Sequence, residues 1–138
     1  FIQFFYKYTA MAKYKIAFSC AFKEFWRYNL YITGKVFHDD ECVEFINLSD
    51  IIAEVGTQLT AAPISYNRKR TTTIKTVDGN AITLYIYIVA HTLPTTNRIE
   101  EAPPFECSVK ISDDEQQIFE RHYKIDQWSG NNIEIKIQ

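Results

Sequence analysis

Three histidines are the residues of this chain best suited to acid–base chemistry near neutral pH. His38 begins an acidic turn, His91 follows an apolar run, and His122 lies between Glu120 and Lys124. A general base acts on a nucleophile or substrate held within hydrogen-bond reach, and no nucleophile is fixed beside His91 or His122. The sequence also contains no G-x-S-x-G, H-E-x-x-H or phosphate-binding glycine motif. We therefore expect surface or strand-end imidazoles and no enzymatic activity, with a small enzyme kept as the third candidate function.

Two acidic turns contain the candidate metal ligands. Residues 38–41 read His-Asp-Asp-Glu, and residues 113–115 read Asp-Asp-Glu. Carboxylate oxygens are the ligands that Ca²⁺ prefers, so two such turns meeting at one end of a fold would suit a hard cation. Adjacent carboxylates on a turn diverge more often than they converge. The sequence therefore predicts two solvated turns, with no bound metal and no cofactor.

The segment 126–132, DQWSGNN, has the residue types that bind sugars. An aromatic plane stacks on the apolar face of a sugar ring, while carboxylate and amide groups form hydrogen bonds with its hydroxyls. Carbohydrate binding at this loop is accordingly one candidate function, with the simpler alternative that the tryptophan folds back onto the domain. The ligand-binding residues would be Asp126, Gln127, Trp128, Asn131 and Asn132.

One basic cluster, Arg68-Lys69-Arg70, is the candidate contact for phosphate groups. The whole chain has 15 Lys and Arg against 17 Asp and Glu, so its net charge is −2. A nucleic-acid-binding domain usually has a wider basic surface, and nucleic acid is therefore not expected as a partner. Residues 99–138 contain nine Asp and Glu against four Lys and Arg. The basic cluster therefore also complements the charge of that part of a second copy.

Strands are the elements that must position these residues, because alternation of apolar and polar residues dominates the chain. Residues 14–23 place Tyr14, Ile16, Phe18 and Cys20 on one face. Similar alternation recurs in residues 26–36, 71–77, 81–93, 105–111, 119–125 and 133–137. Residues 81–93 are apolar on both faces, which indicates a central strand that is covered on both sides or faces a partner.

Two local signals refine this interpretation. Asp78-Gly79 lies between two strand-like runs, a typical type I′ hairpin turn, and predicts that residues 71–77 pair with residues 80–89. Ile51, Ile52, Val55 and Leu59 share a helical face, and capping residues precede them. The pattern therefore predicts one short helix at residues 49–60.

Together these elements predict a single all-β domain spanning residues 1–138. About eight strands, one helix and no regular βαβ alternation favour an antiparallel β-sandwich or a partly closed barrel. The chain of 138 residues is too short for two independent cores. Residues 1–10 alternate with an aromatic face, so we expect an N-terminal strand or arm that adds to a sheet edge of its own or a neighbouring subunit.

Aromatic residues are abundant, with ten Phe, nine Tyr and two Trp. They exceed what one small core needs, and Tyr and Phe are enriched at subunit interfaces. The leading hypothesis is therefore a non-catalytic interaction module that assembles with copies of itself or with a larger protein complex. The expected interface residues are Phe4, Phe5, Tyr6, Tyr8, Tyr31, Tyr85 and Tyr87.

Three cysteines, Cys20, Cys42 and Cys107, indicate the compartment. The number is odd and there is no C-x-x-C, so a disulfide framework is not expected and a reducing environment such as the cytoplasm is favoured. No apolar run approaches the ~18 residues of a membrane-spanning helix. The sequence therefore predicts no membrane span.

Overall fold

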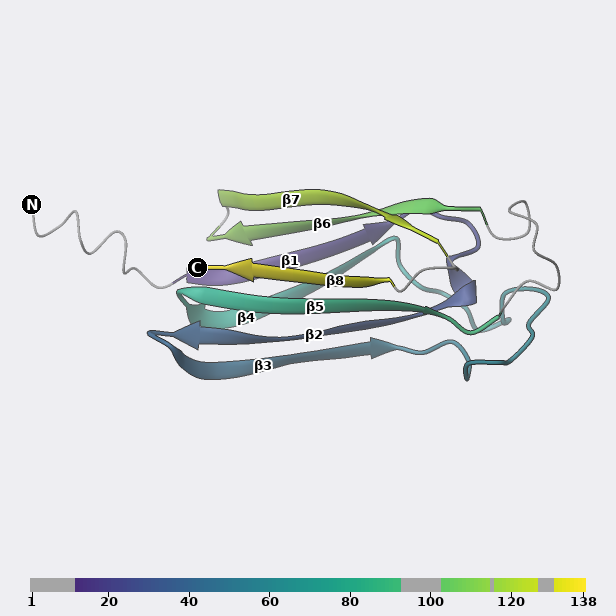
Figure 1. The fold of residues 1–138 in the computed structure, drawn as a ribbon, viewed down its shortest axis with the longest axis horizontal. Helices are drawn as coiled ribbons and strands as arrows, with labels where there is room; N and C mark the ends of the chain where they lie inside the picture. The colour runs from purple at the N-terminus through teal and green to yellow at the C-terminus, as the bar shows by residue number, and fades with distance from the viewer. Residues whose placement is uncertain (1–11, 93–102, 115, 127–130) are drawn as a thin grey trace, which may run out of the picture.

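The computed structural model describes residues 12–92, 103–114, 116–126 and 131–138 (Figure 1). Within these ranges the chain forms eight strands and one short 3₁₀ turn, η1. The strands are β1 (Ala12–Cys20), β2 (Tyr28–His38), β3 (Glu41–Asp50), β4 (Thr71–Gly79), β5 (Ala81–Ala90), β6 (Phe105–Asp113), β7 (Gln116–Ile125) and β8 (Asn132–Ile137), and η1 is Phe25–Arg27.

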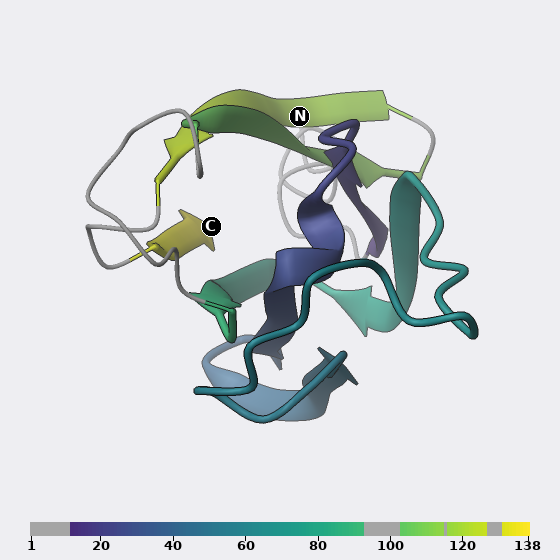
Figure 2. The same cartoon turned by 90° about the vertical axis from the view of Figure 1, so that its right-hand side faces the viewer.

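The strands form two antiparallel four-stranded sheets packed face to face as an open sandwich (Figure 2). Sheet A has the order β4-β1-β6-β7, and sheet B has the order β3-β2-β5-β8. Hairpins join β2 to β3 and β6 to β7, whereas the other connections cross between the sheets. The predicted all-β sandwich is confirmed, and β5 is an interior strand of its sheet as its two apolar faces indicated.

The core lies between the inner faces of the two sheets. Every second residue of β1, from Tyr14 to Cys20, is buried there, opposite the alternating residues Leu30, Ile32 and Val36 of β2. An aromatic cluster closes one end of the core, where Phe25 and Tyr28 each lie edge-on to Phe105 and Phe22 stacks on Phe105 with 4.4 Å between ring centroids. Burial of these alternating rows is what fixes the register of each strand.

The two pairs of sheet edges differ. On one side β3 and β4 meet, where the Val77 backbone N–H donates a hydrogen bond to Glu44 Oε1 at 3.0 Å. On the other side β7 and β8 are the last strands of their sheets, and the two are not paired with each other. The β3 and β4 edges are therefore linked by a side-chain hydrogen bond, and neither pair of edges forms a strand ladder.

The predicted helix at residues 49–60 is wrong. Strand β3 continues through Asp50, pairing with β2 up to Leu30, and the chain then runs as a loop to β4. The Asn29 side chain accepts hydrogen bonds from the backbone N–H groups of Ile52 and Ala53. In a helix that begins here, an N-cap side chain would accept hydrogen bonds from such N–H groups instead. Gly56 has a φ of +99°, which an α-helix excludes.

The predicted hairpin at Asp78-Gly79 is also wrong. Strand β4 pairs with β1 in sheet A, whereas β5 pairs with β2 and β8 in sheet B. Gly79 does not have a positive φ. Its role is steric, because a Cβ there would lie 2.4 Å from Val36 Cγ1 and 2.9 Å from the Phe37 carbonyl oxygen. The chain needs glycine to pass closely over β2 as it crosses between the sheets.

Candidate interaction surface

The outer faces of the two sheets differ in chemistry. The outer face of sheet A is mostly charged and polar on β4, β1 and β6, three of its four strands, and no aromatic side chain points outward from these three. Its outward residues are Thr71, Thr73, Lys75 and Val77 on β4, Lys13, Lys15, Ala17 and Ser19 on β1, and Glu106, Ser108, Lys110 and Ser112 on β6. This is the ordinary surface of a sheet that faces water.

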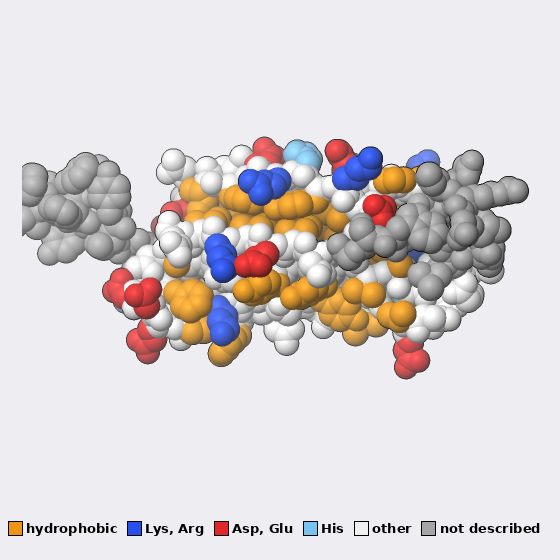
Figure 3. Space-filling model, viewed as in Figure 1, with side chains coloured by type: hydrophobic (Ala, Val, Ile, Leu, Met, Phe, Trp, Pro, Cys, Tyr) orange, Lys and Arg blue, Asp and Glu red, His pale blue; other side chains and the backbone are white. Residues whose placement is uncertain are grey.

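The outer face of sheet B is instead aromatic and aliphatic over three adjacent strands. It consists of Tyr31 and Phe37 on β2, Val43 and Phe45 on β3, and Tyr85, Tyr87 and Val89 on β5, and we refer to it as the aromatic face. Phe45 is 72% exposed and Tyr87 is 37% exposed. Figure 3 shows hydrophobic side chains gathered over β5, β2 and β3, with charged side chains among them.

Strand pairing brings the predicted tyrosines together. Tyr31 and Tyr87 are Cα partners in the ladder between β2 and β5, and Tyr85 lies on the same face, opposite Thr33. Cross-strand neighbours on one face have Cβ atoms about 5 Å apart. Three interface residues predicted from the sequence therefore lie on one continuous surface, while Phe4, Phe5, Tyr6 and Tyr8 lie outside the described residues.

A shallow apolar hollow of about 460 Å³ lies within the aromatic face. Phe45 and Tyr85 border it, and Lys35 Nζ lies 5.6 Å from the centre of the Phe45 ring. A cation over an aromatic ring is attracted by the ring's quadrupole. The hollow combines apolar walls with one positive charge, an arrangement suited to receive an aromatic or acidic side chain.

Charged residues of both signs border the aromatic face on β8. Glu134 is the Cα partner of Tyr85, and Lys136 is the partner of Thr83. Lys136 Nζ lies 3.2 Å from Glu134 Oε1, and both side chains are more than half exposed. Exposed ion pairs of this kind exchange partners at little cost, so both groups are available to a second molecule.

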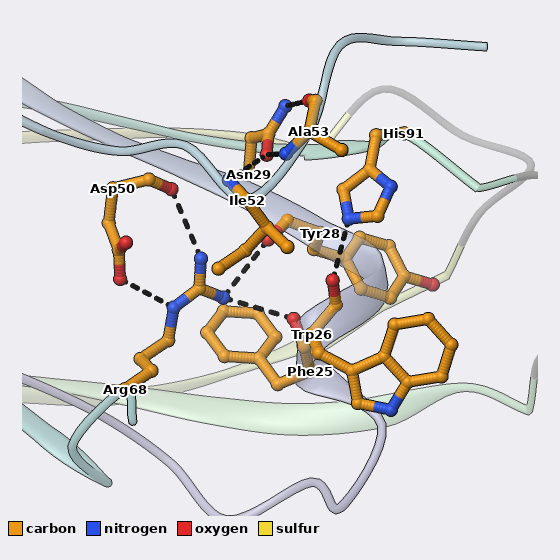
Figure 4. Close-up of polar contacts among 9 residues, drawn as sticks. All are labelled: Phe25, Trp26, Tyr28, Asn29, Asp50, Ile52, Ala53, Arg68 and His91. Atoms are coloured by element: carbon orange, nitrogen blue, oxygen red, sulfur yellow. Dashed lines mark hydrogen bonds and ion pairs between the residues drawn. The ribbon is translucent and has the colours of Figure 1, made fainter. Parts of the chain in front are cut away.

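The three residues of the basic cluster differ in exposure. The Arg68 side chain is only 4% exposed. Its guanidinium forms an ion pair with Asp50 and donates hydrogen bonds of 3.0 Å to the backbone carbonyl oxygens of Phe25, Tyr28 and Asp50 (Figure 4). Arg68 therefore anchors the loop between β3 and β4, and Lys69 and Arg70 remain exposed.

The three histidines lie on different segments and differ in exposure. His91 is fully buried at the end of β5, where Nε2 donates to the Trp26 carbonyl oxygen at 2.6 Å and Nδ1 lies 2.8 Å from Thr92 Oγ1. Both ring nitrogens are thus engaged by the protein. His38 lies 3.2 Å from the neighbouring Asp39 on an exposed turn, and His122 is exposed on β7.

The two acidic turns lie within the described residues except for Glu115. Asp39, Asp40 and Asp114 have positive φ values, the backbone of tight turns between strands. Asp39 Oδ1 accepts a hydrogen bond from Asn80 Nδ2 at 2.8 Å. Over the ranges that the structure covers, no three His, Cys, Asp or Glu side chains are grouped to hold a metal ion.

Two residues of the predicted carbohydrate-binding loop, Gln127 and Trp128, lie outside the described residues. Asn131 Nδ2 donates to the carbonyl oxygens of Asp126 at 2.8 Å and Ile88 at 3.3 Å. Asn132 begins β8 as the partner of Tyr87. The Asn131 amide therefore closes the loop, and carbohydrate binding stays a prediction.

Phe37, Val43 and Phe45 are members of the aromatic face that the sequence analysis did not single out. The odd-numbered residues Val43, Phe45 and Asn47 alternate with half-buried or buried neighbours along β3. The alternation was present in the sequence, but the outward direction of Phe45 follows only from the pairing of β3 with β2.

A scan against protein-family models and searches of curated proteins and of solved structures found no significant match. In the portions of the chain that are described, no helix has the length and apolarity needed to cross a bilayer. The case for function therefore depends on the surface chemistry of the domain itself.

Proposed function

We propose that this protein is a non-catalytic module that self-associates through the aromatic face of sheet B. The contrast between the two outer faces carries the proposal, because one fold presents a polar surface on sheet A and an aromatic surface on sheet B. Isolated exposed apolar residues are normal, whereas a contiguous patch marks an interaction site. Aromatic residues are also the type most enriched in the centres of interfaces.

The size of the face supports a specific contact. The strands of sheet B have 11, 10, 10 and 6 residues. With a spacing of about 4.8 Å and a rise of about 3.3 Å per residue, they give a face on the order of 600 Å². Specific interfaces bury about 800 Å² per partner, and the smaller ones about 600 Å². Two copies meeting face to face through sheet B would therefore form an interface at the lower end of the specific range.

Burial of Phe45 contributes most per residue. With about 200 Å² of side-chain surface and 72% of it exposed, each copy would remove about 140 Å² from water. Burial of a Phe side chain is favourable by at most about 3 kcal/mol per copy, before the costs of association are subtracted. Burial of Tyr85 and Tyr87 adds further favourable free energy. The sum offsets the unfavourable entropy change of association.

The charges favour a second copy as the partner. In a two-fold contact the same surface meets itself, so the surface must be self-complementary. The aromatic face is bordered by Lys35, Glu134 and Lys136, and a two-fold arrangement can set lysines of one copy against Glu134 of the other. The net charge of −2 leaves little repulsion between copies.

The proposal is tested by sedimentation velocity on the parent, Tyr87→Lys and Thr73→Lys. Thr73 is exposed on the outer face of sheet A and is the matched control. We expect the parent and Thr73→Lys to sediment as species larger than the 16.2 kDa monomer, and Tyr87→Lys to shift toward monomer with an unchanged circular dichroism spectrum. A parent that remains monomeric, or equal behaviour of the two variants, would refute the proposal.

A further inference from the structure

Cys20 and Cys107 lie directly opposite each other on neighbouring strands. They are Cα partners in the ladder between β1 and β6, both point into the core, and both are free thiols. No other pair of cysteines in the described chain is paired in this way. The arrangement places two thiols side by side although the sequence separates them widely.

The backbone hydrogen bonds identify the type of pair. The Cys20 N–H donates to the Arg70 carbonyl oxygen, on the side of β4, at 2.9 Å. Tyr14, on the same face of β1, likewise donates toward β4, to Thr76. In an antiparallel ladder the N–H and C=O of one residue point to the same side, so Cys20 and Cys107 form a non-hydrogen-bonded pair. Such pairs have Cα atoms about 4.5 Å apart, within the range of a disulfide.

Cys20 lies nearer the surface than Cys107, with 7% of the residue exposed against 2%. A hollow of about 200 Å³ is lined by Cys20, and Cys107 is not part of its lining. The aromatic rings of Phe22, Phe25 and Tyr66 form its walls, and Arg68, Lys69 and Arg70 border it. Cys20 is therefore the thiol that a small reagent meets first, and the reagent meets positive charge there.

The two thiols also differ in acidity. Burial raises the pKa of Cys107 to about 12, and the nearby Cys20 adds to this rise. Burial raises the pKa of Cys20 as well, but a hydrogen bond with the Phe22 backbone and the Arg68 guanidinium both act to lower it. Because the thiolate is the nucleophile in disulfide exchange, Cys20 is the better suited of the two to react first.

We propose that Cys20 and Cys107 form a reversible cross-strand disulfide by exchange with a small anionic disulfide such as oxidised glutathione. The Cys20 thiolate attacks one sulfur of the reagent, forming a mixed disulfide and releasing one reduced thiol. The Cys107 thiolate then attacks Cys20 Sγ and releases the second reduced thiol. The protein loses two protons and two electrons, and the reagent is reduced by the same two electrons.

The state of this pair would follow the thiol–disulfide balance of the surroundings. A bond between directly opposed strands is constrained by the ladder on either side, and strained disulfides are the ones that act as labile or regulatory bonds. The pair lies in sheet A, remote in the topology from the outer face of sheet B. This inference is therefore independent of the proposed self-association.

The test uses the folded protein with Cys42→Ser as the background, which removes the third thiol, a half-buried group on β3. After incubation with oxidised glutathione, free thiols are alkylated and the peptides are mapped by mass spectrometry. We expect a Cys20–Cys107 disulfide in this background. Adding Cys107→Ser should trap glutathione on Cys20, and adding Cys20→Ser should leave Cys107 unmodified.

A charge comparison tests the role of the basic border. Substituting Lys69→Gln and Arg70→Gln together should slow the reaction with oxidised glutathione roughly threefold or more, because the positive charges attract the anionic reagent. The same substitutions should not slow the reaction with cystamine, which is cationic. If Cys20 and Cys107 both remain free in the folded protein at reagent concentrations that modify Cys42 in the parent, the proposal is wrong. Because that result comes from the parent chain, it does not depend on the folding of any variant.

Discussion

Replacement of Arg68 by methionine is expected to destabilise the domain strongly although Arg68 belongs to a cluster of three basic residues. Methionine keeps the aliphatic volume of the side chain but donates no hydrogen bond. The substitution removes the ion pair with Asp50 and the donors to three backbone carbonyl oxygens. It also removes the guanidinium that lies 4.7 Å from the centre of the Phe25 ring.

The magnitude follows from the burial of these groups. Removing one partner of a buried charge pair costs about 3–5 kcal/mol, because the remaining polar groups lose their partner. The Asp50 side chain is 38% exposed and can regain water, so we expect the lower end, about 3 kcal/mol. For a domain of 138 residues this corresponds to a fall in melting temperature of roughly 10 °C.

Urea unfolding followed by circular dichroism measures this change, with Lys69→Met as the matched control. Lys69 is the exposed neighbour in the same cluster, and its substitution should change the free energy of unfolding by less than about 0.5 kcal/mol. Equal effects of the two substitutions, or an Arg68→Met effect below about 1 kcal/mol, would show that the buried guanidinium does not anchor the loop.

Two further predictions concern the core. Gly79→Ala should destabilise the domain by about 2 kcal/mol, because the added Cβ meets Val36 and the Phe37 carbonyl; an unchanged urea midpoint would contradict this close approach. Burial raises the pKa of Tyr28 from 10.0 and that of Cys107 from 9.0, each to about 12, so the folded state holds these protons more tightly than the unfolded state. Their contribution to stability is therefore complete below pH 9 and is lost as the pH rises toward 12. Urea unfolding at several pH values across this range would measure the loss. A urea midpoint that stays constant or rises with pH would refute the prediction.

The period-2 pattern was sufficient to predict most strands and the inner face of each. Tyr14, Ile16 and Phe18 are buried as the alternation of β1 required, and Ile133 and Ile135 of β8 are buried for the same reason. Alternation of apolar and polar residues indicates that one face of a strand is buried, and each strand of a sandwich buries one face in the core. The number of strands and the sandwich class therefore followed from local information.

The errors arose where long-range pairing decided between two local options. Ile51, Ile52 and Val55 have helical spacing, yet the ladder with β2 and the Asn29 side chain direct the chain into an extended loop. Asp78-Gly79 has the composition of a hairpin, but β4 and β5 find different partners in different sheets. Neither outcome is encoded in the few residues around the site.

The candidate surface was predicted only in part. Tyr31, Tyr85 and Tyr87 were expected at an interface because the chain has more aromatic residues than one small core needs. Their proximity, and the inclusion of Phe45, required the strand order of sheet B. The Cys20–Cys107 pair depends even more on topology, because only the register between β1 and β6 brings the two residues together.

The most direct test of self-association through the aromatic face is a dilution series of ¹⁵N-labelled protein followed by amide NMR spectra. We predict concentration-dependent chemical shifts in the outward residues of sheet B, centred on Tyr31, Phe45 and Tyr87. Amides on the outer face of sheet A, such as those of Lys15 and Lys110, should not change. Spectra that are independent of concentration, or changes confined to sheet A, would contradict the account.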